Sequence, residues 1–417
     1  MFVRLGEDIA DSESREPEIF PRFKNTLSPN EAVVCLINTA IGTGILRLGY
    51  SFRCGIITAL VLTTLIALVN YYSFWLYSKA INQTKRSSFV EIWYFLFGWK
   101  TLILPVAASA IGTLVFSMFF TQCIANYITS LLTELNLYEN NLYINETSVL
   151  IFTFAAFVLP NVFVRSLNTV FKMSVISLGF LALLFIHSIY WMIVEYRKYG
   201  FDPSNQLKLF SFDSSVITCI NALLTAYAVY PLSWPGPRHF SGVNFKSLLS
   251  IFKNLTFFCW VLYASFGTLA YFTFFDKNTG GLIISYYPFG FIRAAAEIAL
   301  IFMIALTLPM QLNQARYNLM EAIFPAQTLS VHGGSWVPLG VLAGLIATFL
   351  AASKGFMGSF MSMVGDISSP ILIFLLPPII YLKAIDDKPW YHVIGSIAFA
   401  LFGIFYSGYI VYLSGLF

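Results

Sequence analysis

Three glycines interrupt an apolar stretch near the N-terminus, where the chain reads NTAIGTGILRLGY from Asn38 to Tyr50. Gly42, Gly44 and Gly49 are poor helix formers, so they predict a break inside a helix of membrane-spanning length. A break frees backbone N–H and C=O groups, which persist at membrane depth only where they contact protein or line a cavity. Such groups could bind a small polar ligand. The alternative is that the glycines only let neighbouring helices pack closely.

A second apolar segment, SSVITCINALLTAYAVYPLSWPGPRHF at 214–240, ends in a cluster of prolines. Pro231, Pro235 and Pro237 lack the amide that a helix needs, and the proline ring clashes with the preceding turn. Interrupted helices at matching positions of two halves of a chain are typical of a binding site at the membrane midplane. The alternative is that these prolines only end the helix at the membrane surface.

The composition is that of a membrane protein with many helices. Hydrophobic residues make up 58% of the 417 residues and charged residues only 11%, and the mean hydropathy is +0.75. Because a bilayer requires roughly 20 apolar residues per helix, we predict about eleven spans. They lie near residues 31–52, 56–78, 101–132, 148–164, 170–195, 214–233, 248–275, 287–310, 336–353, 357–382 and 391–416.

The two interrupted segments are the first and the sixth of these spans, which divides the chain into matching halves. We therefore predict an all-α membrane protein with two inverted repeats of five helices and one peripheral helix. The predicted boundaries are a disordered cytosolic tail over 1–30, repeats over 31–195 and 214–382, and an eleventh helix over 391–416.

The distribution of basic residues predicts the orientation in the membrane. With the N-terminus in the cytosol, 16 of the 24 Lys and Arg residues fall on the cytosolic side, although the loop at 196–213 is an exception. The first thirty residues have no apolar core, so we expect no cleaved signal peptide. The Asn-Glu-Thr sequon at Asn145 lies in a loop without basic residues and is expected to be external and glycosylated.

The sequence gives little support to an enzyme or a metal centre. Its loops are short, it contains no GxxxxGK[ST] motif, and its four histidines have no carboxylate at a useful spacing. The five cysteines form no CxxC pair and are expected to be buried thiols. We therefore expect no enzymatic activity and no bound cofactor. We also expect a monomer in the lipid bilayer, with no nucleic-acid partner.

Three motifs resemble the amino acid/auxin permease family in order and spacing. They are NTAIGTGILRLGYSF at 38–52, LTLPMQLNQARYNLMEAIFP at 306–325 and VGDISSPILIFLLPPIIYLK at 364–383, similar to the family's first, eighth and tenth helices. The likeness covers nearly all of residues 30–417 and is nearest to the sodium-coupled neutral amino-acid transporters. It implies a leucine-transporter-like fold and a secondary active amino-acid transporter, coupled to Na⁺ or H⁺, with alternating access around broken helices.

The resemblance also implies roles for two side chains. In those relatives the first-helix Asn and the eighth-helix Thr serve the cation, and the matching residues here are Asn38 and Thr307. Their oxygens, with carbonyls freed near Thr39 and Gly42, could coordinate sodium, which would place Thr307 within about 5 Å of the first break. The alternatives are an interhelical hydrogen bond for Asn38 and a bond from Thr307 to its own helix.

The implied substrate is a free amino acid held by its two charged ends. Its carboxylate is expected at amides near residues 43–45, where a second half-helix would begin with a positive dipole end. Its ammonium is expected at carbonyls near residues 226–229, where a first half-helix would end. The residues expected to line this site are Thr39, Gly42, Thr43, Gly44, Ile45, Ala226, Val229 and Tyr230.

Two positions depart from the family pattern, and a third places a carboxylate inside a span. Tyr230 stands where relatives have a histidine, and Arg47 replaces a small residue. Arg47 either faces the external vestibule, which would favour an acidic substrate, or snorkels to the membrane surface. Glu297, a carboxylate well inside a span, is either a proton carrier or a partner of Arg293 on the same helix, and we favour the pairing.

Two other functions compete with transport. A non-transporting amino-acid sensor of the same fold would be expected to carry a longer cytosolic tail than residues 1–30 provide. A channel would be expected to show a repeated pore motif or a ring of like charges. Because the external disulfide-bearing domain of the neutral amino-acid branch is absent from the sequence, the expected location is either the plasma membrane or a vacuolar or lysosomal membrane.

Overall fold

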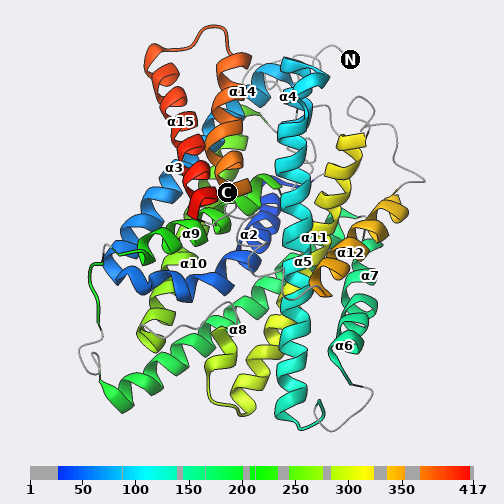
Figure 1. The fold of residues 1–417 in the computed structure, drawn as a ribbon, viewed down its shortest axis with the longest axis vertical. Coiled ribbons are helices and arrows are strands. Elements are labelled where there is room, and N and C mark those ends of the chain that lie inside the picture. Colours follow the sequence, from blue (N-terminus) through cyan, green and yellow to red (C-terminus); the bar gives the residue numbers. More distant parts are fainter. Residues whose placement is uncertain are drawn as a thin grey trace, which may run out of the picture.

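Every regular element is a helix among the residues that a computed structural model of the chain describes (Figure 1). These residues are 27–86, 88–138, 144–164, 166–200, 207–211, 213–232, 244–275, 283–323, 336–352 and 367–413. Seven of the described helices are long and apolar enough to cross a membrane. The predicted all-α membrane architecture is confirmed, whereas the number of about eleven crossings stays a prediction.

The helices follow the predicted spans closely. In chain order they are α2 (Pro29–Ser51), α3 (Ile56–Thr84), α4 (Phe89–Phe97), α5 (Ile103–Glu134), α6 (Glu146–Thr153), α7 (Leu159–Val162), α8 (Leu167–Tyr199), α9 (Ser215–Leu232), α10 (Phe245–Phe274), α11 (Phe291–Ile323), α12 (Trp336–Ala352), α14 (Leu376–Ala384) and α15 (Trp390–Leu413). Only α4 lies in a stretch predicted to be a loop. Ser88 caps it and Gly98, with φ +75°, ends it.

Helix α2 lies in the middle of the bundle, and α15 lies at its edge (Figure 1). α2 contacts α8, α9, α10 and α11, and its Leu36 and Ile41 are no more than 1% exposed. α15 packs on α14 and the π-helical turn η7 (Ile371–Leu375) and leaves Phe405 74% exposed. The predicted peripheral position of the last helix is therefore confirmed.

The break predicted in the first span is wrong for this structure, because α2 is one uninterrupted helix from Pro29 to Ser51. A glycine weakens a helix by only about 1 kcal/mol, whereas each backbone group freed in a membrane costs several. Gly42 acts in packing instead. A Cβ atom there would lie 2.9 Å from Cζ of Phe120 and 3.3 Å from Cγ2 of Thr307.

The break predicted in span six falls largely outside the described residues. Helix α9 includes Pro231 and is described as far as Leu232. Pro235, Gly236 and Pro237 lie beyond the described residues, so the prediction of an interruption there stays open.

Prolines inside three other helices are accommodated in two ways. Pro160 and Pro377 each follow a π-helical turn, η3 (Phe154–Val158) and η7, whose wider ring relieves the clash with the preceding carbonyl. Pro309 in α11 removes the amide that would pair with the carbonyl of Ala305. Asn161 of α7 replaces that donor, with its Nδ2 2.9 Å from the Ala305 oxygen. This side chain fixes α7 against the middle of α11.

Close packing between α2 and α10 predicts that any side chain added at Gly267 lowers the stability of the protein. A Cβ atom there would lie 2.2 Å from Cε2 of Phe52, whose side chain is fully buried just after α2. We expect Gly267→Ala to destabilise the protein by about 1–3 kcal/mol through overpacking. Gly179→Ala in α8 is the control, because nothing lies within 4 Å of the added methyl. Thermal unfolding in detergent checks this, and an equal melting temperature for both variants would contradict it.

Candidate functional site

Four buried polar side chains meet where α2, α8 and α11 touch. The hydroxyl of Thr307 lies 3.1 Å from Oδ1 of Asn38 and 2.9 Å from the carbonyl of Met303, two acceptors that compete for its one proton. Nδ2 of Asn38 donates to the Ser174 hydroxyl at 3.2 Å. The Ser177 hydroxyl donates to the Met303 carbonyl at 3.0 Å and lies 3.5 Å from the Thr307 hydroxyl. The four polar side chains are at most 2% exposed, and we call them the polar cluster.

The polar cluster combines two predicted residues with two that sequence reasoning missed. The expected approach of Thr307 to the first span is confirmed by its hydrogen bond to Asn38. The alternatives also hold: Asn38 forms interhelical hydrogen bonds with Thr307 and Ser174, and the Thr307 hydroxyl lies within hydrogen-bond distance of the Met303 carbonyl of its own helix. Because a hydroxyl has one proton, Thr307 donates to Asn38 or to Met303 at any moment. Ser174 and Ser177 lie three residues apart on one face of α8, and that spacing in an apolar span was the available signal.

Thr39 does not join the polar cluster through a described hydrogen bond. Its hydroxyl donates to the carbonyl of Cys35 at 2.9 Å, within its own helix. Gly42 lies beside the cluster, because the methyl of Thr307 packs against it. The carbonyls expected to be freed near these two residues lie inside continuous α2.

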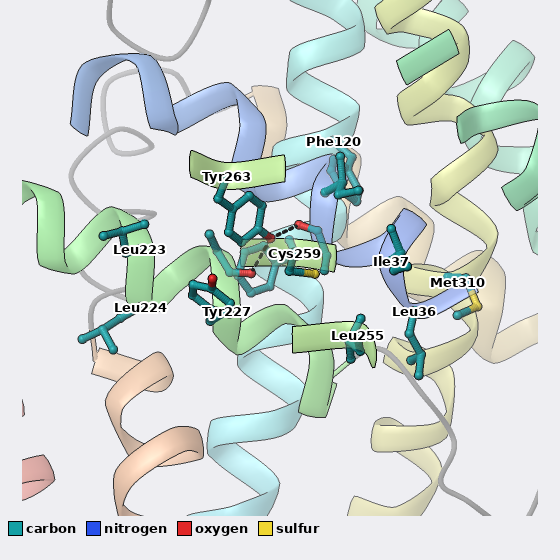
Figure 2. Close-up of a cluster of buried hydrophobic side chains, with 14 of the residues drawn as sticks. Leu36, Ile37, Phe120, Leu223, Leu224, Tyr227, Leu255, Cys259, Tyr263 and Met310 are labelled. Atoms are coloured by element: carbon teal, nitrogen blue, oxygen red, sulfur yellow. Dashed lines mark hydrogen bonds between the residues drawn. The ribbon is translucent and has the colours of Figure 1, made fainter. Parts of the chain in front are cut away.

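A tyrosine hydroxyl connects the first and sixth predicted spans (Figure 2). Tyr263 of α10 is fully buried, and its hydroxyl lies 2.8 Å from the Ala40 carbonyl of α2 and 3.1 Å from the Ala226 carbonyl of α9. Tyr227 packs edge-on against its ring, with centroids 5.1 Å apart. The Ala226 carbonyl, the atom predicted to meet an ammonium group, thus already accepts a hydrogen bond.

The expected anion cradle is not present in this structure. The amides of Thr43, Gly44 and Ile45 lie within uninterrupted α2, where helical carbonyls four residues earlier are their partners. Val229 and Tyr230 lie in the last turns of α9. The side chains of five predicted residues are outside the described part of the chain: Thr43, Ile45, Arg47, Val229 and Tyr230.

Glu297 forms the ion pair that the sequence favoured. Its Oε1 accepts from Nε of Arg293 at 3.0 Å and from the Ser130 hydroxyl at 3.1 Å, and the residue is 0% exposed. Arg293 also donates to the Tyr287 carbonyl at 3.0 Å and to Ser130 at 3.1 Å, and it lies 3.4 Å from Glu134. This network joins α5, α11 and the segment before α11.

Two further predicted features are placed by the structure. Asn145 caps α6, with its Oδ1 accepting from the Ser148 amide at 2.9 Å. That bond leaves the side-chain nitrogen as the atom for a glycan, and glycosylation stays a prediction. All five cysteines are buried thiols, as expected.

Comparison with known proteins identifies the sequence family. Residues 25–414 match the family described as transmembrane amino acid transporter protein.

Comparison with solved structures identifies the fold. MhsT, solved in complex with L-phenylalanine, is 16% identical with a TM-score of 0.62, over 94% of this chain and 99% of that one. An Na⁺-coupled sialic acid symporter in an outward-open state is 15% identical, with a TM-score of 0.57 over 94% and 90%. Mhp1, a nucleobase-cation-symport-1 family transporter, is 13% identical, with a TM-score of 0.56 over 96% and 97%. The predicted leucine-transporter-like fold is confirmed, because these proteins share it.

The buried ion pair predicts that removing one of its two charges destabilises the protein more than removing both. Arg293→Gln leaves the Glu297 carboxylate without its cation and should destabilise the protein by about 3–5 kcal/mol. The double variant Arg293→Gln/Glu297→Gln removes both charges and should recover part of that loss. Lys198→Gln is the control, because its exposed pair with Glu195 at 3.8 Å is worth about 1 kcal/mol or less. Unfolding in detergent measures all three, and a double variant less stable than Arg293→Gln would contradict the pairing.

Proposed function

The chain belongs to the transmembrane amino acid transporter family, and from this membership we propose that it carries a free amino acid across a membrane together with a sodium ion. The protein is an integral membrane protein with several spanning helices. We propose further that its N-terminus is cytosolic, as the distribution of basic residues favours.

The observation that supports sodium is the set of oxygens in the polar cluster. Asn38 Oδ1 and Thr307 Oγ1 are 3.1 Å apart, and Ser177 Oγ is 3.5 Å from Thr307 Oγ1. Two oxygens 3.1 Å apart, each about 2.4 Å from a shared cation, would subtend an angle of about 80°. That angle is near the value for neighbouring ligands of a six-coordinate ion. The polar cluster therefore requires little rearrangement to coordinate sodium.

The chemistry of the polar cluster favours a metal cation over a proton. Amides and hydroxyls are neutral ligands that do not ionise near neutral pH, so they cannot carry a proton as a charge. Glu297 is ten residues before Thr307 on α11, which separates them by about 15 Å along the helix. Its carboxylate is engaged by Arg293 and Ser130. Proton coupling through Glu297 would have to break this network, so we propose sodium as the coupling ion.

We propose that the substrate lies between the middle of α2 and the C-terminal half of α9. Ala40 and Ala226 present carbonyls from these two helices to one hydroxyl, that of Tyr263. An ammonium group is a stronger donor than a phenol and carries several protons. In the proposed bound state it replaces Tyr263 on the Ala226 carbonyl. The segment from Thr39 to Ile45 then forms the opposite wall.

Uptake into proteoliposomes tests the transport proposal. A panel of radiolabelled amino acids is offered with a sodium gradient or a pH gradient imposed separately. We expect the sodium gradient to drive uptake of at least one of them. Thr307→Val, which keeps the shape and loses the ligand oxygen, should weaken the apparent sodium affinity about tenfold or more.

Thr348→Val is the matched control, because the Thr348 hydroxyl has one hydrogen-bond partner among the described residues, the carbonyl of Gly344 in its own helix α12. Its sodium dependence should be that of the wild type. Uptake driven by the pH gradient alone would contradict the sodium assignment. A folded protein that binds an amino acid but transports none would contradict transport and favour the sensor.

The proposed competition between substrate and Tyr263 gives a second prediction. Tyr263→Phe removes the hydroxyl from the Ala226 carbonyl, and losing one net hydrogen bond of about 1 kcal/mol should lower KM about fivefold. Tyr227→Phe is the control, because the Tyr227 hydroxyl is buried without a described hydrogen-bond partner. A higher KM for Tyr263→Phe, with Tyr227→Phe unchanged, would contradict the competition.

A further inference from the structure

A small, partly enclosed cavity of 40 Å³ lies between α5 and α6, two helices that contact each other (Figure 1). It is near the end of α5 from which the chain leads to α6. On the proposed topology this end of the bundle faces away from the cytosol. The polar cluster lies on α2, α8 and α11, so the cavity is a separate place in the fold.

Most of the described residues that line the cavity carry side-chain oxygens. They are Gln122, Asn126 and Thr129 of α5, Tyr138 just after α5, and Glu146, the first residue of α6. The three residues of α5 are four and three positions apart, so they share one face of the helix. None of the described lining residues is basic.

The polar side chains on α5 require a partner that the described protein does not supply. α5 is apolar enough to cross a membrane, and Asn126 is eight residues, about 12 Å, before its end. The side-chain amides of Gln122 and Asn126 and the hydroxyl of Thr129 form no hydrogen bond to another described residue. Polar groups at this depth are costly when unpaired, so the contents of the cavity must satisfy them.

Packing between the two helices brings three of the oxygens to one level. Ala125 of α5 and Leu150 of α6 belong to the same buried apolar cluster. Glu146 is one turn before Leu150, and Thr129 is one turn after Ala125. Because α6 packs against the end of α5 that leads to it, the helices run in opposite directions. The Glu146 carboxylate, the Thr129 hydroxyl and the Asn126 amide therefore surround the outer part of the cavity.

We propose that this cavity binds a calcium ion through the side-chain oxygens of Glu146, Asn126 and Thr129, with water molecules as the remaining ligands. Calcium takes six to eight oxygen ligands, and carboxylates, amide carbonyls and water are typical ones. One water molecule requires roughly 10–15 Å³ of cavity, so 40 Å³ accommodates the ion with about two waters. Gln122 lies one turn deeper than Asn126 and contacts the ion through one of these waters.

Organic ligands and anions fit the cavity less well. Pockets for organic ligands have volumes of roughly 300–1,000 Å³, far more than the cavity provides. An anion would meet the negative charge of Glu146 without a basic lining residue to balance it. The connecting residues 135–145 also contain no Lys or Arg. A free amino acid is therefore excluded by both its size and its carboxylate.

Calcium fits better than other common cations. Magnesium demands near-ideal octahedral geometry and gives up its waters reluctantly, whereas calcium accepts an irregular set of ligands. A sodium ion gains only half as much Coulomb energy from Glu146 as a divalent ion at the same distance. The positive dipole end of α6 is offset by the negative dipole end of α5, which ends nearby at Glu134. The carboxylate of Glu146 therefore sets the charge of the cavity.

Terbium luminescence of the purified full-length chain in detergent tests the proposal. Tb³⁺ occupies calcium sites and emits when a nearby tyrosine is excited, and Tyr138 lines the cavity. We expect saturable emission that Ca²⁺ suppresses at lower concentrations than Mg²⁺ or Na⁺. Ca²⁺ should also raise the melting temperature, because it binds the folded chain. The half-maximal Ca²⁺ concentration should be about 0.1–1 mM, as in extracellular calcium modules.

Four variants locate the ion. Glu146→Gln keeps the size and removes the charge, so it should weaken Tb³⁺ binding about tenfold or more and reduce the calcium-dependent rise in melting temperature. Thr129→Val should weaken binding about fivefold through the loss of one oxygen. Tyr138→Phe should lower the emission and keep the rise in melting temperature. Glu195→Gln is the control, because Glu195 pairs with Lys198 on α8 and should respond as the wild type does.

An equal calcium response of Glu146→Gln and the wild type would overturn the site. If Glu146→Gln is already less stable without calcium, Thr129→Val decides, and a wild-type calcium response in that variant would overturn the site. Suppression of the emission by Na⁺ or Mg²⁺ at the same concentration as Ca²⁺ would overturn calcium as the ion. These readouts do not depend on transport, so their failure leaves the proposed function untouched.

Discussion

The structure depends on one constraint: polar groups inside a membrane must find partners within the protein. The middle of α11 shows how this constraint positions helices. Pro309 leaves the carbonyl of Ala305 without its helical donor, and Asn161 of α7 supplies one at 2.9 Å. About half a turn away, Thr307 binds Asn38 of α2. A single helix thus fixes two others through buried hydrogen bonds, in a region where hydrophobic burial alone would not specify their register.

The same constraint explains why the first span is continuous. The sequence correctly indicated that Gly42 is special, and it left open a backbone break or close packing. A break would expose amides and carbonyls, whereas packing requires only the absence of a side chain. The ring of Phe120 and the methyl of Thr307 occupy the space that a Cβ atom would take. In this structure the absence of a side chain at Gly42 therefore allows α5 and α11 to pack against α2. The polar contact between α2 and α11 is made by side chains, Asn38 and Thr307, and not by backbone groups freed by a break.

Much of the fold followed from apolar segment length, because hydrocarbon thickness fixes how long a spanning helix must be. The pairing of Arg293 with Glu297 was also predictable, since residues four apart lie on one helix face. Ser174, Ser177, Asn161 and Tyr263 were not predicted as site residues. Their roles arise from contacts between helices far apart in sequence, which periodicity within one helix does not report. The short helix α4 was missed because nine residues are too few to span a membrane.

The central claim is that Asn38 and Thr307 act as one unit that holds the coupling cation. A double-mutant cycle on the sodium concentration required for amino-acid binding tests it most directly, with Asn38→Ala, Thr307→Val and their combination. If both residues serve one ion, each single variant raises that concentration about tenfold, and the double variant raises it little further. If the two effects multiply to about a hundredfold, the residues act independently, and the shared cation site proposed here is wrong.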